Sequence, residues 1–115
     1  MSRKSQSISL PIKERDWTFN LLADRTFDKL YNSGGESNTA MTLSNQYRVD
    51  FRKSDWCLED IIHELGHVLK AMSETHTADL TPDQMEELMC QIMAKNFFDI
   101  GVWSSRIAEK FFGRE

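Results

Sequence analysis

The chain of 115 residues has only two cysteines, two prolines and five glycines, and it has no long apolar run. Two cysteines are too few for the disulfide framework of a small secreted domain. No stretch approaches the roughly 20 apolar residues that a membrane helix needs. Basic residues are not in excess, since the formal net charge is −4, and this disfavours nucleic acid or an anionic membrane as the partner. The N-terminus has no apolar signal core, so we expect a cytoplasmic protein.

The rest of the composition is typical of one globular domain, with 40% hydrophobic and 28% charged residues. Residues 1–15 are polar and basic and contain Pro11, so we expect a flexible N-terminal arm there, followed by a single domain over residues 16–115. Cys57 and Cys90 each lie in a stretch that we predict to be helical. We expect buried thiols in a reducing compartment, with one bridge left open as the alternative.

The apolar periodicity predicts an α+β fold. Alternating residues predict a strand over residues 17–22, and residues 39–44 and 47–51 are expected to form a hairpin. Helices are expected over residues 24–31, 55–72, 81–99 and 104–112, with Asp55 capping the second of them and Gly101 following the end of the third. The third of these helices has a strong start signal. Thr81 and Gln84 stand at the two positions of a capping box, and Pro82 stands at the first helical position.

Residues 63–67 read His-Glu-Leu-Gly-His, and the rest of the chain is organised around them. Two histidines four residues apart on a helix project to the same side, so His63 and His67 are able to hold one metal ion. Glu64 lies between them and is the candidate general base of a metal hydrolase. The apolar residues of this helix fall on the opposite arc, which leaves one face for a core and one for a cleft. The plainer alternative is two surface histidines on an ordinary amphipathic helix.

A catalytic zinc usually has three protein ligands and one water, so a third ligand is needed. Glu87 is our first candidate because it shares a polar arc of the following helix with Gln91, and a ligand must face the cleft. Glu86, which lies nearer the apolar side, is the alternative third ligand. The plainer alternative for either glutamate is a solvated charge in the first turn of the helix. His76 is a further open candidate, beside its reading as a solvated loop histidine.

These residues resemble the zincin metallopeptidases, and among them the gluzincin type, in which a glutamate from a downstream helix joins the two histidines. Glu87 follows His67 by twenty residues, which is the spacing of thermolysin-like enzymes. Gln91 stands where that family has an aspartate that braces a motif histidine, so the chain departs from the family pattern at this position. The layout of residues 16–100 also resembles the small zincin-like proteins of phages and prophages.

The resemblance implies a minimal zincin-like domain, in which a small antiparallel or mixed sheet packs on the motif helix and on a second, ligand-bearing helix. It implies a zinc-dependent metallopeptidase with Zn²⁺ on His63, His67 and Glu87 and with Glu64 as general base. We expect a monomer that takes a peptide or protein substrate, in the host cytoplasm if the chain is phage-encoded. The alternative is a catalytically silent binding protein that keeps the zinc site, and a weaker one is a purely structural zinc site.

Overall fold

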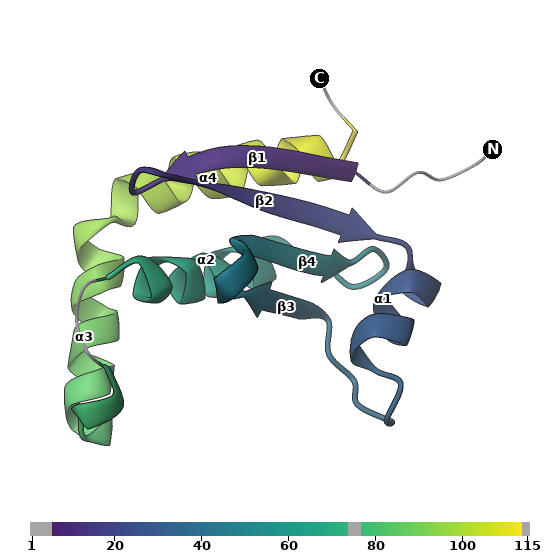
Figure 1. The fold of residues 1–115 in the computed structure, drawn as a ribbon. Coiled ribbons are helices and arrows are strands. Elements are labelled where there is room, and N and C mark those ends of the chain that lie inside the picture. Colours follow the sequence, from purple (N-terminus) through teal and green to yellow (C-terminus); the bar gives the residue numbers. More distant parts are fainter. Residues whose placement is uncertain (1–5, 74–76, 114–115) are drawn as a thin grey trace.

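Four strands form one mixed sheet in the order β1-β2-β4-β3 (Figure 1). The strands are β1 (Gln6–Ile12), β2 (Arg15–Leu22), β3 (Ala40–Leu43) and β4 (Arg48–Arg52). β2 is antiparallel to β1 and parallel to β4, and β3 is antiparallel to β4 at the far edge. The computed structural model describes residues 6–73 and 77–113, and within these ranges the fold is a compact α+β arrangement of this sheet with four helices.

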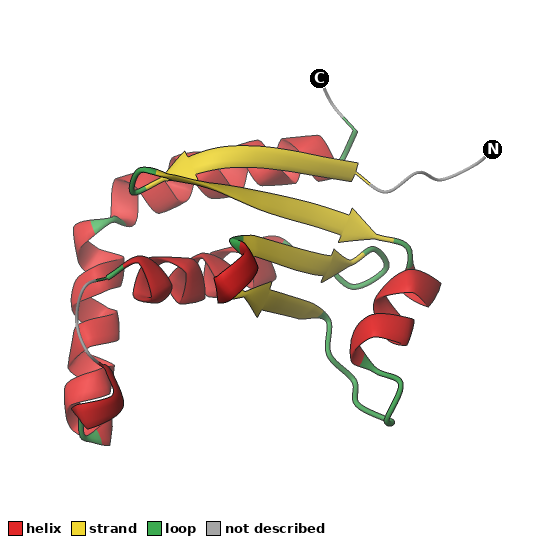
Figure 2. Cartoon of the chain, viewed as in Figure 1, coloured by secondary structure: helices red, strands yellow, loops and turns green. Residues whose placement is uncertain are grey.

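The four helices are α1 (Asp24–Tyr31), α2 (Leu58–Met72), α3 (Pro82–Lys95) and α4 (Phe97–Phe111). Two short 3-10 turns, Ser44–Gln46 and Thr77–Asp79, join β3 to β4 and precede α3. Figure 2 shows α2 and α4 on the same side of the sheet, with α1 at the opposite end of the molecule from α3. The predicted α+β class, the strand before α1 and the β3–β4 hairpin are therefore confirmed.

The core lies between the sheet and the pair α2 and α4, and strand alternation determines which side chains enter it. Trp17, Phe19 and Leu21 of β2 are buried, whereas the residues between them are only partly covered. Their neighbours Val49 and Phe51 lie beside them in the parallel register of β4. The helices contribute the remaining buried apolar side chains, among them Ile61, Leu65, Val68, Ile107 and Phe111.

The predicted flexible arm over residues 1–15 is wrong for its described part, because residues 6–12 form the edge strand β1. Leu10 and Ile12 are fully buried, Ile8 is partly buried against the core, and Ser7, Ser9 and Pro11 face outward. This is the period-two alternation of a strand. Pro11 is compatible with the strand because β1 has a sheet neighbour on one side only. Residues 1–5 lie outside the described residues.

Three predicted helix boundaries are also wrong: the start of α2, the end of α3 and the start of α4, which was predicted at residue 104. α2 begins at Leu58 with Cys57 as its N-cap residue, and Asp55 instead pairs with Arg52 at 2.6 Å. The helix expected over residues 81–99 ends at Lys95, and α4 begins at Phe97 and runs through Gly101. The capping box at Thr81 and Gln84 is confirmed.

Asn96 explains the break between α3 and α4. Its side-chain nitrogen donates a hydrogen bond to the carbonyl oxygen of Ile92 at 2.8 Å, and the residue is buried. An asparagine that bonds the preceding turn of backbone in this way competes with continuation of the helix. The chain therefore turns at Asn96 and α4 returns along the sheet.

Cys57 and Cys90 are both exposed and both free, so the prediction of buried thiols is wrong. Cys57 precedes the first turn of α2, and Cys90 lies on an outer side of α3. In the described part of the chain, no helix combines the length and the apolar character that crossing a bilayer requires.

Candidate metal centre

α2 brings three side chains with metal-ligating atoms together on its outer side. His63, Glu64 and His67 each offer one ligand atom, and these atoms lie within 4.8 Å of one another. The two imidazole rings are 4.9 Å apart between centroids and are inclined at 76°. Both histidines are exposed, whereas Glu64 is only 8% exposed. The three residues expected from the sequence therefore do meet.

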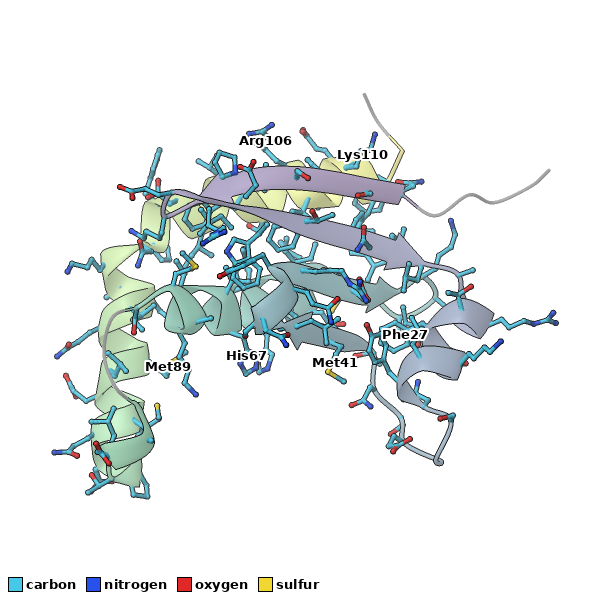
Figure 3. The ribbon with its side chains drawn as sticks, in the orientation of Figure 1. Phe27, Met41, His67, Met89, Arg106 and Lys110 are labelled. Carbon is cyan, nitrogen blue, oxygen red and sulfur yellow. The ribbon has the colours of Figure 1, made fainter. Side chains whose placement is uncertain are left out.

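The packing of α2 determines which way this group faces. Ile61, Leu65 and Val68 are fully buried between the helix and the sheet. Because they occupy one side of the helix, His63 and His67 must project from the other side. Figure 3 shows His67 below α2, with Met41 of β3 to one side and Met89 of α3 to the other. The group thus lies on the side of α2 that faces the edge strand β3.

The chemistry of this donor set fits a borderline divalent cation. Two imidazole nitrogens with a carboxylate oxygen nearby are ligands that suit Zn²⁺, and they suit Mg²⁺ or Ca²⁺ less well, because those cations prefer an all-oxygen shell. The exposed rings leave room for a water or a substrate on the ion. The residues present therefore fit a zinc ion, although two histidines alone do not complete a catalytic site.

β3 supplies a contact that sequence reasoning missed. The hydroxyl of Thr42 donates a hydrogen bond of 2.5 Å to Oε1 of Glu64. The other carboxylate oxygen, Oε2, lies 4.0 Å from Nε2 of His63. Thr42 faces α2 because it is paired with Val49, whose side chain lies in the core. Only the strand register reveals this, so nothing in the sequence singled out Thr42.

The group lines a shallow groove of about 330 Å³. The groove is bordered by α2 on one side and by β3 and Asn38, two residues ahead of it, on the other. Its lining residues are Asn38, Ala40, Met41, Thr42, His63, Glu64 and His67.

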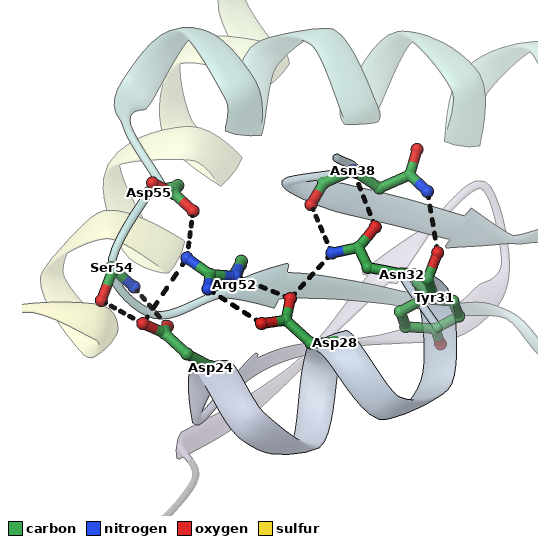
Figure 4. A network of polar contacts seen from close by, with 8 residues as sticks. All are labelled: Asp24, Asp28, Tyr31, Asn32, Asn38, Arg52, Ser54 and Asp55. Carbon is green, nitrogen blue, oxygen red and sulfur yellow. Dashed lines mark hydrogen bonds and ion pairs between the residues drawn. The ribbon is translucent and has the colours of Figure 1, made fainter. Parts of the chain in front are cut away.

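Asn38 is held at the groove by the end of α1 (Figure 4). Its backbone nitrogen donates to the side-chain oxygen of Asn32 at 2.8 Å, and the Asn32 side-chain nitrogen donates back to the Asn38 carbonyl at 3.1 Å. The side chain of Asn38 also donates to the carbonyl oxygen of Tyr31 at 3.0 Å. These bonds fix the loop that leads into β3, and so they fix one wall of the groove.

Arg52 ties α1 to the connection between β4 and α2 (Figure 4). Its guanidinium lies 2.9 Å from Asp28 and 2.6 Å from Asp55, and it approaches Asp24 at 3.5 Å. The hydrogen bonds from Arg52 and then from Asn32 lower the pKa of Asp28 from 3.8 to about 2. The same carboxylates raise the pKa of Arg52. This cluster stabilises the segment that connects β4 to α2, the motif helix.

A second buried carboxylate supports β4 on the sheet face that α1 borders. Asp50 is 1% exposed and accepts hydrogen bonds from Asn20 at 2.9 Å and from the Tyr31 hydroxyl. Arg48 lies 3.2 Å from it. Burial, followed by the bond to Asp50, raises the pKa of the Tyr31 phenol. Each of these side chains has at least one partner within the cluster, although Nε of Arg48 has none, so we assign the cluster a structural role.

The two candidates for the third ligand both lie on α3, and neither belongs to the group on α2. Glu87 is exposed and accepts a hydrogen bond of 3.3 Å from the Gln91 side chain. Glu86 is exposed as well. The Met89 and Met93 side chains of α3 approach α2 at Gly66. The choice between Glu86 and Glu87 stays a prediction, and His76 lies outside the described residues.

The chain was compared with protein-family models, with curated proteins and with solved structures, and none of them matches it.

Proposed function

We propose that this chain is a zinc-dependent metallopeptidase of the zincin type. The observation that carries the proposal is the meeting of His63, His67 and the nearly buried Glu64 on one side of α2, beside an edge strand. Two exposed imidazoles and one sheltered carboxylate are what metal-assisted hydrolysis requires of a protein. The α+β arrangement also supports the resemblance on which the sequence interpretation rests.

His63 and His67 would hold the ion, together with a glutamate from α3. Zn²⁺ bound there supplies a Lewis acid that polarises the scissile carbonyl and lowers the pKa of a bound water toward neutrality. The exposed faces of the two rings leave the groove open to a substrate. Because the groove is shallow, we expect low intrinsic specificity for side chains.

Glu64 acts as the general base. Oε1 of its carboxylate is engaged by Thr42, so Oε2 is the oxygen free to accept a proton from the attacking water. That proton is then delivered from Oε2 to the leaving amine. The backbone of α2 and the bond from Thr42 together hold the carboxylate in place, which limits the reorganisation needed at the moment of reaction.

β3 is the proposed substrate-binding strand. It pairs with β4 on one side and is the last strand of the sheet on the other. An extended peptide can add to such an edge through backbone hydrogen bonds. Ala40, Met41 and Thr42 of this strand line the groove beside the histidines, so a peptide on this edge would pass the candidate zinc site.

The direct test is cleavage of an unstructured protein, such as casein, by zinc-loaded chain and by the Glu64→Gln variant. We expect loss of cleavage in this variant, with unchanged zinc content by elemental analysis. Glu59→Gln is the matched control, since Glu59 is an exposed glutamate of the same helix. It should keep both activity and zinc.

Two results would argue against the proposal. Equal zinc in the wild type and in the His63→Ala, His67→Ala double variant would remove the metal site. Zinc binding without cleavage of unstructured proteins or of a mixed peptide library would leave the alternative function, a binding protein that retains the metal.

A further inference from the structure

A group of exposed apolar side chains lies outside the metal groove, along α2 and α4. Phe97 and Phe98 are each 79% exposed, Leu58 is 50% exposed and Val102 is 43% exposed. They border a hollow of about 730 Å³ that Ile62 and Met93 also line. We call these six residues, with the hollow between them, the α2/α4 face.

Gly101 lies in the middle of α4 on this face, and nothing within the described chain explains it. A Cβ placed there would meet no atom within 4 Å. Glycine inside a helix is unfavourable relative to alanine because it has more freedom to lose on folding. Ser105, one turn later, is small and exposed too. Small residues at this spacing let a second helix approach closely, and that would account for the glycine.

The α2/α4 face carries both protruding rings and a hollow that can receive them, so two copies of this face can fit each other. Two phenylalanine rings protrude beside a hollow large enough to receive rings of that size. Asp99 and Arg106 are exposed and lie seven residues apart on α4, about two turns. When two copies of α4 pair antiparallel about an axis near Val102, Asp99 of each copy lies near Arg106 of the other. This is the pattern of an isologous interface.

The available area is compatible with a stable pair. At about 200 Å² for each phenylalanine, the two rings offer roughly 300 Å² per chain, or about 600 Å² for two copies. Leu58, Val102 and a rim of polar atoms supply the remainder of the roughly 1,000 Å² that a specific interface needs. An apolar patch of this size is often a functional surface.

We propose that the α2/α4 face is the interface of a homodimer, in which Phe98 of each copy packs beside Ser105 of the other and the two α4 helices approach each other closely at Gly101. This differs from the monomer expected from the sequence. The residues that line the hollow and those that line the metal groove have no member in common. The dimer would therefore leave both metal grooves open, and the proposal does not depend on the peptidase activity.

The test is sedimentation velocity of the full chain over a hundredfold range of concentration. We expect a concentration-dependent dimer for the wild type and a monomer for Phe98→Ser. Leu30→Ser is the matched control, because Leu30 is 54% exposed on α1, outside the α2/α4 face. It should dimerise as the wild type does. A wild type that is monomeric throughout, or a Phe98→Ser variant that still dimerises, would overturn the proposal.

Gly101→Leu provides a second variant that does not depend on loss of folding. In a monomer it fills open space and improves helix propensity, so the unfolding midpoint measured at low concentration should rise. In the dimer it blocks the close approach of α4, and we expect the dimer Kd to rise about tenfold or more. An unchanged Kd would contradict the interface.

A lipid surface or another protein on this face would give a result different from that of the homodimer. Binding of the monomer to vesicles of phosphatidylcholine and phosphatidylglycerol, abolished by Phe98→Ser, would overturn the dimer in favour of a lipid surface. A monomer that forms a stoichiometric complex with an amphipathic helical peptide at Phe98 would overturn it in favour of a heterologous partner.

Discussion

The hydroxyl of Thr42 lies 2.5 Å from Oε1 of Glu64 and donates a hydrogen bond to it. One residue belongs to the edge strand and the other to the motif helix, and they are 22 positions apart in the chain. The strand that we propose to bind substrate is thus bonded directly to the proposed base. A shift of β3 relative to α2 would move the carboxylate, so the proposed function implies that substrate binding and the placement of the base are coupled.

Thr42→Val should lower kcat about tenfold while KM changes by less than about twofold, because removing one hydrogen bond of roughly 1 to 1.5 kcal/mol affects the base and not the peptide contacts. Thr42→Ser keeps the hydroxyl and should restore most of kcat. Steady-state kinetics with a fluorogenic peptide would measure both. The zinc content and the unfolding midpoint should match the wild type. Full activity in Thr42→Val, or equal loss in the serine variant, would rule out this role.

The orientation of α3 leads us to expect Glu86, and not Glu87, as the third zinc ligand. Met89 and Met93 approach α2 at Gly66, and Glu86 precedes them by three and seven residues, so it shares their side of the helix. Glu87 is bonded to Gln91 on a neighbouring side. Glu86→Gln should weaken zinc affinity by about a hundredfold or more.

Glu87→Gln is the matched control and should leave zinc affinity within about threefold of the wild type. Competition with a chromophoric chelator would measure both variants. The reverse order would support the sequence-based preference for Glu87, and equal affinities in all three proteins would exclude a third ligand from either glutamate.

Asp28 should make the stability of the fold depend on acid pH. Its pKa falls from 3.8 to about 2 in the folded chain, so the unfolded chain binds the proton more readily in that window. The contribution is complete above pH 3.8 and is lost as the pH falls toward about 2. Urea unfolding across this range should show a decline in the free energy of unfolding that is shallower in Asp28→Asn. Asp16→Asn, at an exposed position of β2, is the control and should keep the full decline.

Gly66 should tolerate one added carbon and no more. A Cβ at this position would lie 3.5 Å from Sδ of Met93 and 3.7 Å from Cε of Met89, which are ordinary contacts. Gly66→Ala should therefore stabilise α2 by roughly 0.5 to 1 kcal/mol. Gly66→Leu should displace α3, lower the unfolding midpoint and weaken zinc binding through the third ligand. Thermal unfolding and chelator competition measure these effects, and a leucine variant that retains both properties would contradict the close approach of α3.

Strong local patterns in the sequence predicted much of the fold. The alternation through Trp17, Phe19 and Leu21 predicted β2, and the capping box at Thr81 predicted the start of α3. β1 was missed because the polar and basic residues around it and Pro11 indicated a flexible arm, although Ile8, Leu10 and Ile12 alternate with Ser7, Ser9 and Pro11. The end of α3 was missed because a buried side-chain bond from Asn96, which no periodicity reports, interrupts the helix.

The candidate site also has a part that the sequence predicted and a part that it did not. The relation of His63, Glu64 and His67 is local to one helix, so it could be predicted from their spacing. The role of Thr42 depends on strand register, and the choice of third ligand depends on how α3 crosses α2. Both are tertiary properties that the order of residues does not encode locally.

The sheet order places β1 and β3 at opposite edges, with two strands between them. Neighbouring strands lie about 4.8 Å apart, so β1 lies roughly 14 Å from β3, the edge strand beside the histidines. An affinity handle or a fluorophore attached ahead of β1 should therefore not obstruct the groove. Chain immobilised on a sensor through that handle would leave the groove accessible to peptides and chelators in the flow.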